Sequence, residues 1–265
     1  MRTGLSIPPF TDASTVVNMA VDAEAAGWDG VFLWDHMQFS QRRPDVHDPW
    51  VLLGAMAART ETVRLGTLVT PLARRRPWVV AKHLTTLDHV SNGRAVLGVG
   101  LGEPSDADFG AFGDPDSPRR RAHAVDEALT LHHELLRGGA IAHHGARYDV
   151  EATLRPRPLQ RPRPPIWIAA IAPHRRPLAR AARWDGVVPL GLPSGYMTPD
   201  QLSTYLDATE RPDGWDVVAS RAPGVPAGEY ADVGATWLID STWPEGDWVD
   251  EFGARIRAGP SRRPG

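Results

Sequence analysis

Short apolar runs alternate with stretches of helical period along most of the chain. The runs predict eight strands, at 4–7, 30–34, 63–69, 94–99, 166–169, 186–190, 216–219 and 236–240. They are apolar at consecutive positions, which is typical of parallel strands covered on both faces. Between them, apolar residues recur three and four positions apart, and Pro or Gly often marks the ends. This pattern predicts helices around 16–23 and at 49–60, 77–91, 118–137, 174–183, 199–210, 226–233 and 244–257.

The alternation favours an α/β fold in one domain that spans residues 1–265. Eight strand–helix units in about 250 residues fit a closed (β/α)8 barrel, or TIM barrel, whose interior is filled by side chains. Counting units leaves a second topology open, the open doubly wound sheet. The segment 138–165, rich in Pro, Arg and His, interrupts the repeat and is expected to lie outside the barrel.

Composition narrows the classes of function. Hydrophobic residues make up 42% and charged residues 23% of the chain, enough for a large core. The formal net charge of −3 gives no basic excess for a phosphate backbone, so nucleic acid is not an expected partner. Cysteine is absent, which excludes disulfides and thiol chemistry. Since no apolar run reaches the roughly 20 residues of a membrane helix and the N-terminus lacks a signal-like apolar segment, we expect a cytoplasmic protein with no membrane partner.

The carboxyl ends of the strands are where a TIM barrel places its chemistry. His36 stands at the end of the second predicted strand, next to Asp35. An imidazole whose tautomer is fixed by a neighbour makes a good general acid or base near neutral pH. A structural histidine bonded to a loop carbonyl is the alternative, and Asp35 is more typical of a carboxylate that bonds loop amides. The adjacent histidine pairs 132–133 and 143–144 point apart, so no metal site is predicted.

Three further strand ends are candidates for ligand binding. The glycine-rich segment 98–102 would let a flat ligand approach the backbone, with a plain tight turn as the alternative, and no helix is expected after it before about residue 118. The segment 172–177 leads into a helix whose free amides and cationic neighbours favour a phosphate, unless its arginines are simply solvated. The three arginines 74–76 follow the third strand and either line the barrel mouth or face water.

Several motifs together resemble the bacterial luciferase-like flavin oxidoreductases. They are residues 25–36 (AAGWDGVFLWDH), 62–71 (TVRLGTLVTP), 84–94 (LTTLDHVSNGR) and 98–102 (GVGLG). Later segments match the same pattern, at 165–168, 181–186, 235–237 and 255–260. The resemblance extends over essentially the whole chain and indicates the family rather than the substrate.

The resemblance implies an active site at the barrel mouth. His36 would be the family's active-site histidine, and the Leu68–Val69 bond would be a non-prolyl cis peptide in a bulge behind the isoalloxazine ring. The cofactor contacts that it implies are Ser6, Thr67 (facing the ring), Val69, Gly100, Gly102, Ala170, His174, Arg175 and Arg176. The loop 172–176 would hold the phosphate, although this chain has Ala169-Ala170 where many relatives have Gly-Gly.

The cofactor implied is reduced FMN, with F420 as the alternative. With FMN and O2, the enzyme would oxygenate a small organic substrate and would be served by a separate flavin reductase. With F420 it would transfer hydride, His36 would handle a proton, and cationic residues would hold the acidic tail. Trp34 and Trp50, with Trp167 and Trp237, are expected to wall the substrate pocket, although core packing explains at least two of the four.

Two hypotheses that involve no flavin turnover stay open beside this one. The chain could be a non-catalytic flavin-binding paralogue, which would bind flavin without converting a substrate. It could also be a metal-dependent barrel hydrolase, which would need a metal and ignore flavin. In each case a homodimer is ordinary for such a barrel.

Overall fold

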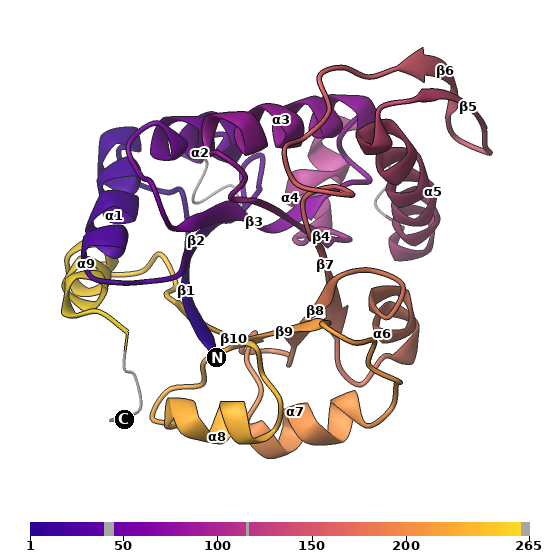
Figure 1. Cartoon of the computed structure of the whole chain (residues 1–265). Helices are drawn as coiled ribbons and strands as arrows, with labels where there is room; N and C mark the ends of the chain where they lie inside the picture. Colours follow the sequence, from indigo (N-terminus) through magenta and orange to yellow (C-terminus); the bar gives the residue numbers. More distant parts are fainter. Residues whose placement is uncertain (40–44, 115–116, 261–265) are drawn as a thin grey trace.

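The computed structural model describes residues 1–39, 45–114 and 117–260. Eight parallel strands close into a barrel in the order β1-β10-β9-β8-β7-β4-β3-β2 (Figure 1). They are β1 (Arg2–Ile7), β2 (Gly30–Leu33), β3 (Arg64–Pro71), β4 (Ala95–Gly100), β7 (Ile166–Ile171), β8 (Gly186–Leu190), β9 (Asp216–Ser220) and β10 (Trp237–Ser241). Every predicted strand is present, with ends within two residues of those expected. The predicted (β/α)8 barrel is confirmed, and the open doubly wound sheet is wrong.

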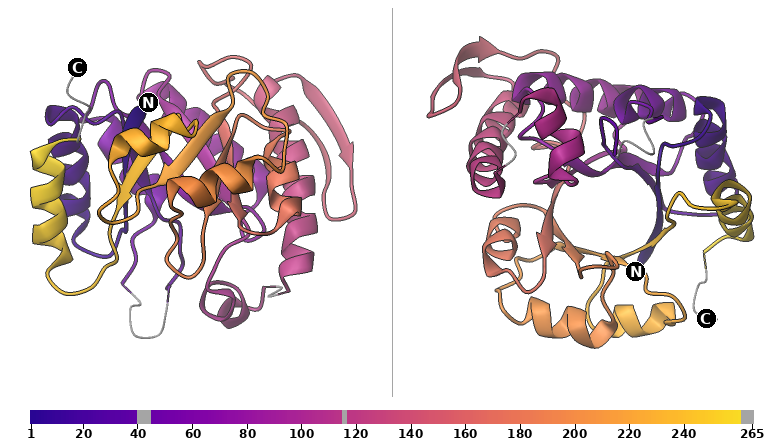
Figure 2. Two further views of the ribbon diagram at one scale, coloured as in Figure 1. Left: turned by 90° about the horizontal axis from the view of Figure 1, so that it is seen from below. Right: turned by 180° about the vertical axis from the view of Figure 1, so that it is seen from behind.

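Helices surround the barrel on its outside (Figures 1 and 2). Eight of them are α1 (Ala13–Ala25), α2 (Pro49–Ala57), α3 (Pro77–Val90), α5 (Pro118–Arg137), α6 (Arg175–Ala181), α7 (Pro199–Leu206), α8 (Ala227–Asp232) and α9 (Trp248–Ala258). These are the eight predicted helices. The start of α2 shows why the pattern predicts them, because Asp48 caps it by accepting from the Trp50 and Val51 amides and Pro49 occupies the first turn.

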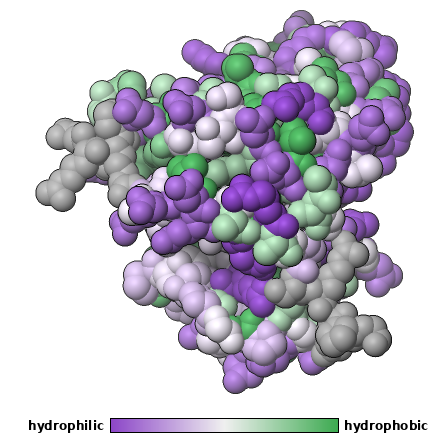
Figure 3. Space-filling model, turned by 90° about the vertical axis from the view of Figure 1, so that its left-hand side faces the viewer, coloured by the Kyte–Doolittle hydropathy of each residue, from purple (hydrophilic) through white to green (hydrophobic). Residues whose placement is uncertain are grey.

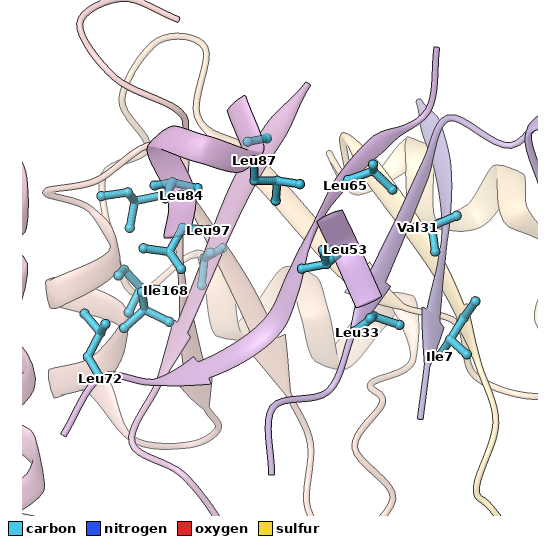
Figure 4. Close-up of a cluster of buried hydrophobic side chains, with 14 of the residues drawn as sticks. Ile7, Val31, Leu33, Leu53, Leu65, Leu72, Leu84, Leu87, Leu97 and Ile168 are labelled. Atoms are coloured by element: carbon cyan, nitrogen blue, oxygen red, sulfur yellow. The ribbon is translucent and has the colours of Figure 1, made fainter. Parts of the chain in front are cut away.

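The main hydrophobic core lies between the strands and the helices. Alternate residues of each strand face outward toward the helices, and the others face the barrel interior. Figure 4 labels part of this outer layer, in which strand residues meet helix residues: Val31, Leu33, Leu65 and Leu97 from the strands, Leu53 from α2, and Leu84 and Leu87 from α3. Each fully buried leucine or isoleucine contributes roughly 2 kcal/mol to folding. This layer fixes the helices on the barrel.

A second, smaller apolar cluster fills the barrel interior. Its centre is three aromatic rings, Phe32, Trp167 and Trp237, whose centroids lie 5.3 to 5.8 Å apart. Trp167 and Trp237 come at the start of their strands, so the rings fill the amino-terminal half of the barrel. Two of the four tryptophans expected as pocket walls therefore belong to the core. The carboxyl-terminal end is left for ligands.

Two regions differ from the sequence prediction. The segment 138–165 does lie outside the barrel, but it contains an antiparallel hairpin of β5 (Ala140–His144) and β6 (Asp149–Thr153) that projects beyond α5 in Figure 1. The loop after β4, where no helix was expected before about residue 118, forms the short helix α4 (Ser105–Asp108) and the turn η1 (Gly110–Phe112). Neither the hairpin nor the loop with α4 and η1 has an apolar periodicity long enough to reveal it, because the elements in each are too short.

The outer surface of the molecule carries both hydrophobic and hydrophilic residues. On the side of α1 and α9, Figure 3 shows small hydrophobic patches scattered among hydrophilic residues. Single exposed hydrophobic residues of this sort are normal on a folded domain. In the described part of the chain, no helix combines the length and the apolar character that crossing a bilayer requires.

Candidate active site

A cavity of about 170 Å³ lies at the barrel mouth. Its floor is apolar and comes from the ends of the strands: Leu68, Val69, Val188, Leu190 and Ile239. Hydroxyl groups stand among these side chains: Ser6, Ser194, Ser220, Ser241 and Thr242. An apolar pocket with a few polar groups suits a flat ring system that has hydrogen-bonding edges. The apolar side chains and hydroxyl groups of this cavity therefore fit the ring of a flavin or a deazaflavin.

Three of the predicted site residues meet at this cavity. Ser6, Trp34 and Val69 line it, and the Trp34 indole Nε1 donates to Ser6 Oγ over 2.9 Å. The predicted bulge is confirmed, since Leu68–Val69 is a cis peptide and the β3–β4 register shifts between Thr67 and Thr70. The strand ends β1, β2 and β3 thus contribute the residues that the sequence assigned to this face.

His36 follows β2 at the rim of the mouth and is paired with a carboxylate. Its Nδ1 lies 2.7 Å from Asp108 Oδ2, the side chain of Asp108 is fully buried, and that of His36 is 16% exposed. The other oxygen of Asp108 accepts from the Met37 amide at 2.9 Å. An ionised carboxylate can only accept, so His36 Nδ1 carries the hydrogen and Nε2 is left to exchange a proton.

Asp108 is held in its charged form by the groups around it. Burial raises the pKa of this carboxyl, but the hydrogen bond and charge of His36, the charge of Arg74 and the Met37 amide outweigh burial. The pKa of Asp108 is therefore below its ordinary value, and the carboxylate is ionised at neutral pH. It fixes the tautomer and the orientation of His36.

Asp35, the sequence neighbour of His36, has a different task. Its buried carboxylate accepts from Thr70 Oγ1 at 2.8 Å, from Arg74 Nη2 at 2.9 Å and from Arg75 Nη2 at 2.7 Å. The interpretation of Asp35 as structural is supported, but its partners are guanidinium and hydroxyl groups rather than loop amides. The neighbour that fixes His36 is Asp108, not Asp35. Arg74 and Arg75 are mostly buried in these pairs, so neither expected position, lining the mouth or facing water, describes them.

Thr67 belongs to the same network rather than to the cavity wall. It is fully buried, donates to the Gly98 carbonyl at 3.2 Å and lies 3.0 Å from Thr70 Oγ1. The sequence analysis expects Thr67 to face the cofactor ring. In the structure its hydroxyl group instead bonds the Gly98 carbonyl and so links β3 to β4. Together with Asp35, these bonds form a polar network that we call the Asp35 network: Asp35, Thr67, Thr70, Arg74 and Arg75.

The glycines after β4 are explained by the protein's own packing. A Cβ on Gly100 would lie 2.5 Å from a methyl group of Val69. At Gly102, where φ is +87°, a Cβ would lie 2.6 Å from the Phe109 ring. The sequence suggested that these glycines make room for a ligand. In the structure they let the loop fold back, and this fold brings Asp108, next to Phe109, under His36.

The other predicted cofactor residues do not line the mouth cavity itself. Ala170 is buried in the outer core layer. His174, Arg175 and Arg176 are exposed where α6 begins, and Arg175 lines an adjoining cleft of about 570 Å³ beside α7, which shares Ser194 and Tyr196 with the mouth cavity. Trp50, expected as a pocket wall, is buried in α2 with its ring 5.5 Å from that of His83, so it belongs to the contact between α2 and α3.

Sequence reasoning missed the aromatic surround of His36. The ring of His36 lies 4.9 Å from Phe39, 6.1 Å from Trp34 and 6.3 Å from Phe10, measured between centroids. Trp243 packs edge-on against Trp34 at 5.6 Å. Trp34, already expected as a pocket wall, and Phe39 lie on the same loop as His36, whereas Phe10 and Trp243 come from the loops after β1 and β10, which nothing in one sequence joins to it. Among the described residues, no group of three or more His, Asp or Glu could hold a metal ion.

Comparison with known proteins agrees with this architecture. The sequence model of the luciferase-like monooxygenase family matches residues 1–222. An F420-dependent glucose-6-phosphate dehydrogenase of Microbacterium testaceum (strain StLB037) is 39% identical over 174 residues, which cover 62% of this chain and 49% of that protein. The chain spans about half the length of the curated relatives that it matches first.

Two solved structures share the fold. The coenzyme F420-dependent tetrahydromethanopterin reductase from Methanopyrus kandleri superposes with a TM-score of 0.77 at 17% identity, over 97% of this chain and 96% of that one. The oxygenating constituent of 3,6-diketocamphane monooxygenase from Pseudomonas putida, in complex with FMN, gives 0.68 at 20% identity, over 84% and 67%. The match to the family model covers most of the barrel and includes His36 and Asp108, and on this basis the chain belongs to the luciferase-like monooxygenase family.

Proposed function

We propose that this chain is an oxidoreductase that transfers hydride between a deazaflavin of the F420 type and a small alcohol or carbonyl compound. The observation that carries the proposal is the His36–Asp108 pair, 2.7 Å apart, with the His36 ring 6.1 Å from that of Trp34, which lines the mouth cavity. Oxidation of an alcohol removes hydride from carbon and a proton from oxygen. His36 Nε2 suits the proton, because Asp108 occupies Nδ1 and stabilises the imidazolium that forms.

The cavity supplies the residues that would hold the cofactor ring. The apolar floor with Val69 would support one face, and the hydroxyl groups of Ser6 and Ser220 would bond the polar edge. The bound deazaflavin would supply the carbon that accepts or donates hydride. The Asp35 network holds the loop that carries His36, so the imidazole keeps its place through a reaction cycle.

Oxygenation of an organic substrate with reduced FMN and O2, which the sequence motifs favour, is the second candidate. It rests on the aromatic rings around His36, which exclude water, and it would need a separate flavin reductase as partner. Two observations favour hydride transfer instead. Trp243, the outer ring of that group, is 52% exposed, which leaves the rim wet, and the M. testaceum relative is named for F420. We also propose that the substrate is a small molecule and that the chain forms a homodimer.

Anaerobic calorimetric titration tests the cofactor first. Purified chain is titrated with F420, FMN and reduced FMN, and we expect F420 to bind most tightly. Tight binding of reduced FMN alone, with substrate-dependent O2 consumption, would replace the proposal by the oxygenase. Binding of none of the three would contradict both candidates.

Replacement of His36 tests the mechanism. We expect His36→Ala to lower turnover by roughly 10²-fold or more, the usual scale for a general acid or base, and to leave cofactor affinity within a few-fold. His144→Ala is the matched control, because His144 is exposed on the β5–β6 hairpin. Turnover of His36→Ala equal to that of the control would remove His36 from the mechanism.

A further inference from the structure

A further cavity, of about 290 Å³ and lined by arginines, lies beside the start of α3. Its lining consists of Ala73, Arg74, Arg75, Arg76, Asp114, Arg147 and Tyr148. None of these residues lines the mouth cavity. The cavity is therefore a separate place on the molecule, which we call the arginine pocket.

Behind the inner wall of the arginine pocket lie buried nitrogen atoms that lack hydrogen-bond partners among the described residues. Arg74 is 5% exposed, yet its Nε and Nη1, like Arg75 Nε, are buried without a hydrogen bond in the described part of the chain. Arg74 Nη1 lies 3.6 Å from Asp108 Oδ2, which is too long for a hydrogen bond. A buried donor left unpaired costs about 1–3 kcal/mol, and more when it is charged. Because these nitrogen atoms have almost no solvent exposure, an anion in the cavity would lie near their positive charge without bonding them directly.

The outer part of the pocket carries two more guanidinium groups. Arg76 lies over the Trp78 ring at 5.6 Å, and Arg147 lies over the Tyr148 ring at 5.9 Å. The two rings contact each other edge-on at 5.9 Å, so both arginines belong to one wall. Within the described residues, neither arginine has an ion pair shorter than 4 Å, and Asp114 is the one carboxylate in the lining.

We propose that the arginine pocket binds an oxyanion, either a phosphate or a carboxylate group. Planar guanidinium groups bond two oxygens of such groups at once, which a point charge cannot do. Two such groups, those of Arg76 and Arg147, stand at the rim of the pocket, and Arg74 and Arg75 lie behind them, paired with Asp35. The volume is large enough for a phosphate or a short dicarboxylate. The site is argued from the chain's own residues and does not depend on the hydride-transfer proposal.

Because Arg74 also contacts the Asp35 and Asp108 carboxylates, it should not be replaced in a test of binding. Arg76 and Arg147 are exposed, so a double variant, Arg76→Gln with Arg147→Gln, should fold normally. Arg183→Gln is the matched control, since Arg183 is 67% exposed and lines neither cavity. Unfolding midpoints of all three proteins are compared first.

The binding experiment uses calorimetry on the cofactor-free chain, with inorganic phosphate and with glutarate, at constant ionic strength set with chloride. We expect saturable binding of at least one probe, weakened tenfold or more in the double variant and less than twofold in Arg183→Gln. Phosphate binding alone identifies a phosphate group, and glutarate binding alone identifies a carboxylate chain. Binding of neither probe, or equal affinity in the wild type and the double variant, overturns the proposal. Since no cofactor is present, such a failure leaves the proposed function untouched.

Discussion

Two arginine-rich segments of the chain, 74–76 and 175–176, look alike in sequence and differ in the structure. Both follow a barrel strand and precede a helix. Arg74 and Arg75 are mostly buried and bonded to Asp35, and they hold the loop that carries His36. Arg175 and Arg176 are exposed, and no ion pair is found for them in the part of the chain that the structure describes. The buried carboxylate of Asp35, rather than the arginines themselves, therefore separates a segment that is fixed in the protein from one that stays exposed.

Removing that carboxylate should have the largest effect. Asp35→Ala leaves two buried guanidinium groups without their anion, and we expect it to lower the free energy of unfolding by about 3–5 kcal/mol. Urea unfolding followed by circular dichroism measures the change. Asp22→Asn is the control, because Asp22 pairs with Arg257 at the surface, at 3.7 Å, and should cost less than about 1 kcal/mol. Equal losses in the two variants would mean that the Asp35 network is no more than a surface pair.

The next effect is on the rate. Asp108→Asn keeps the shape of the side chain but offers His36 an amide in place of an acceptor-only carboxylate, so we expect turnover to fall by roughly 10²-fold. Asp106→Asn, an exposed neighbour on α4, should leave turnover within twofold. A normal rate in Asp108→Asn would show that His36 needs no fixed tautomer.

The same pair predicts a dependence of stability on pH. The pKa of Asp108 is lowered from its ordinary 3.8, so the folded chain binds fewer protons here than the unfolded chain as the pH falls through this region. The stability that the ionised carboxylate contributes is therefore complete above about pH 5 and is lost as the pH falls below 4 through the folded-state pKa. Urea unfolding of wild type and Asp108→Asn at pH 7, 5 and 3 should show their difference shrinking only at pH 3. A difference that stays constant to pH 3 would contradict the assignment.

At the exposed segment 175–176, removing the positive charges should change cofactor binding and not stability. We expect Arg175→Gln with Arg176→Gln to alter the free energy of unfolding by less than about 0.5 kcal/mol, as is usual for exposed positions. Cofactor affinity should fall by roughly three- to tenfold at low salt and less at high salt, because exposed charges are screened. Calorimetry at two salt concentrations checks this. A loss of stability without a loss of affinity would place these arginines with Arg74 and Arg75.

The smallest effect concerns Trp50. We expect Trp50→Phe to leave cofactor affinity unchanged, because the ring lies between α2 and α3, away from the mouth. Trp34→Phe, which loses the bond to Ser6, should weaken cofactor binding measurably in the same titration. Weaker binding in Trp50→Phe would return this residue to the pocket wall.

The barrel could be predicted from the sequence because its signals are local. Runs of buried strand residues and helices opened by Pro or capped by Asp48 show themselves within ten or twenty positions. The position of His36 at a strand end follows from the same pattern. The hairpin β5–β6 could not be predicted in this way, since its strands alternate between half-buried and exposed residues and only Ile141 and Val150 pack against the core.

The partners inside the site could not be predicted, because they depend on tertiary contacts. Asp108 meets His36 from 72 positions away, on a four-residue helix that has no apolar face to announce it. The one usable signal is the pair of acidic residues, Asp106 and Asp108, which suit the first turn of a helix. In the same way, Thr67 and Gly102 were assigned to a ligand because a sequence does not show that Gly98 and Phe109 already contact them.

The closeness of Trp34 to His36 gives this protein an optical sensor of its own. An imidazolium ion quenches the emission of a nearby excited indole by accepting an electron, and neutral imidazole does so far less. The two ring centroids are 6.1 Å apart, so we expect the light emitted by Trp34 to dim when His36 takes up a proton. The difference between wild-type and Trp34→Phe emission would then follow the charge of this one histidine in unlabelled protein, during titration or turnover.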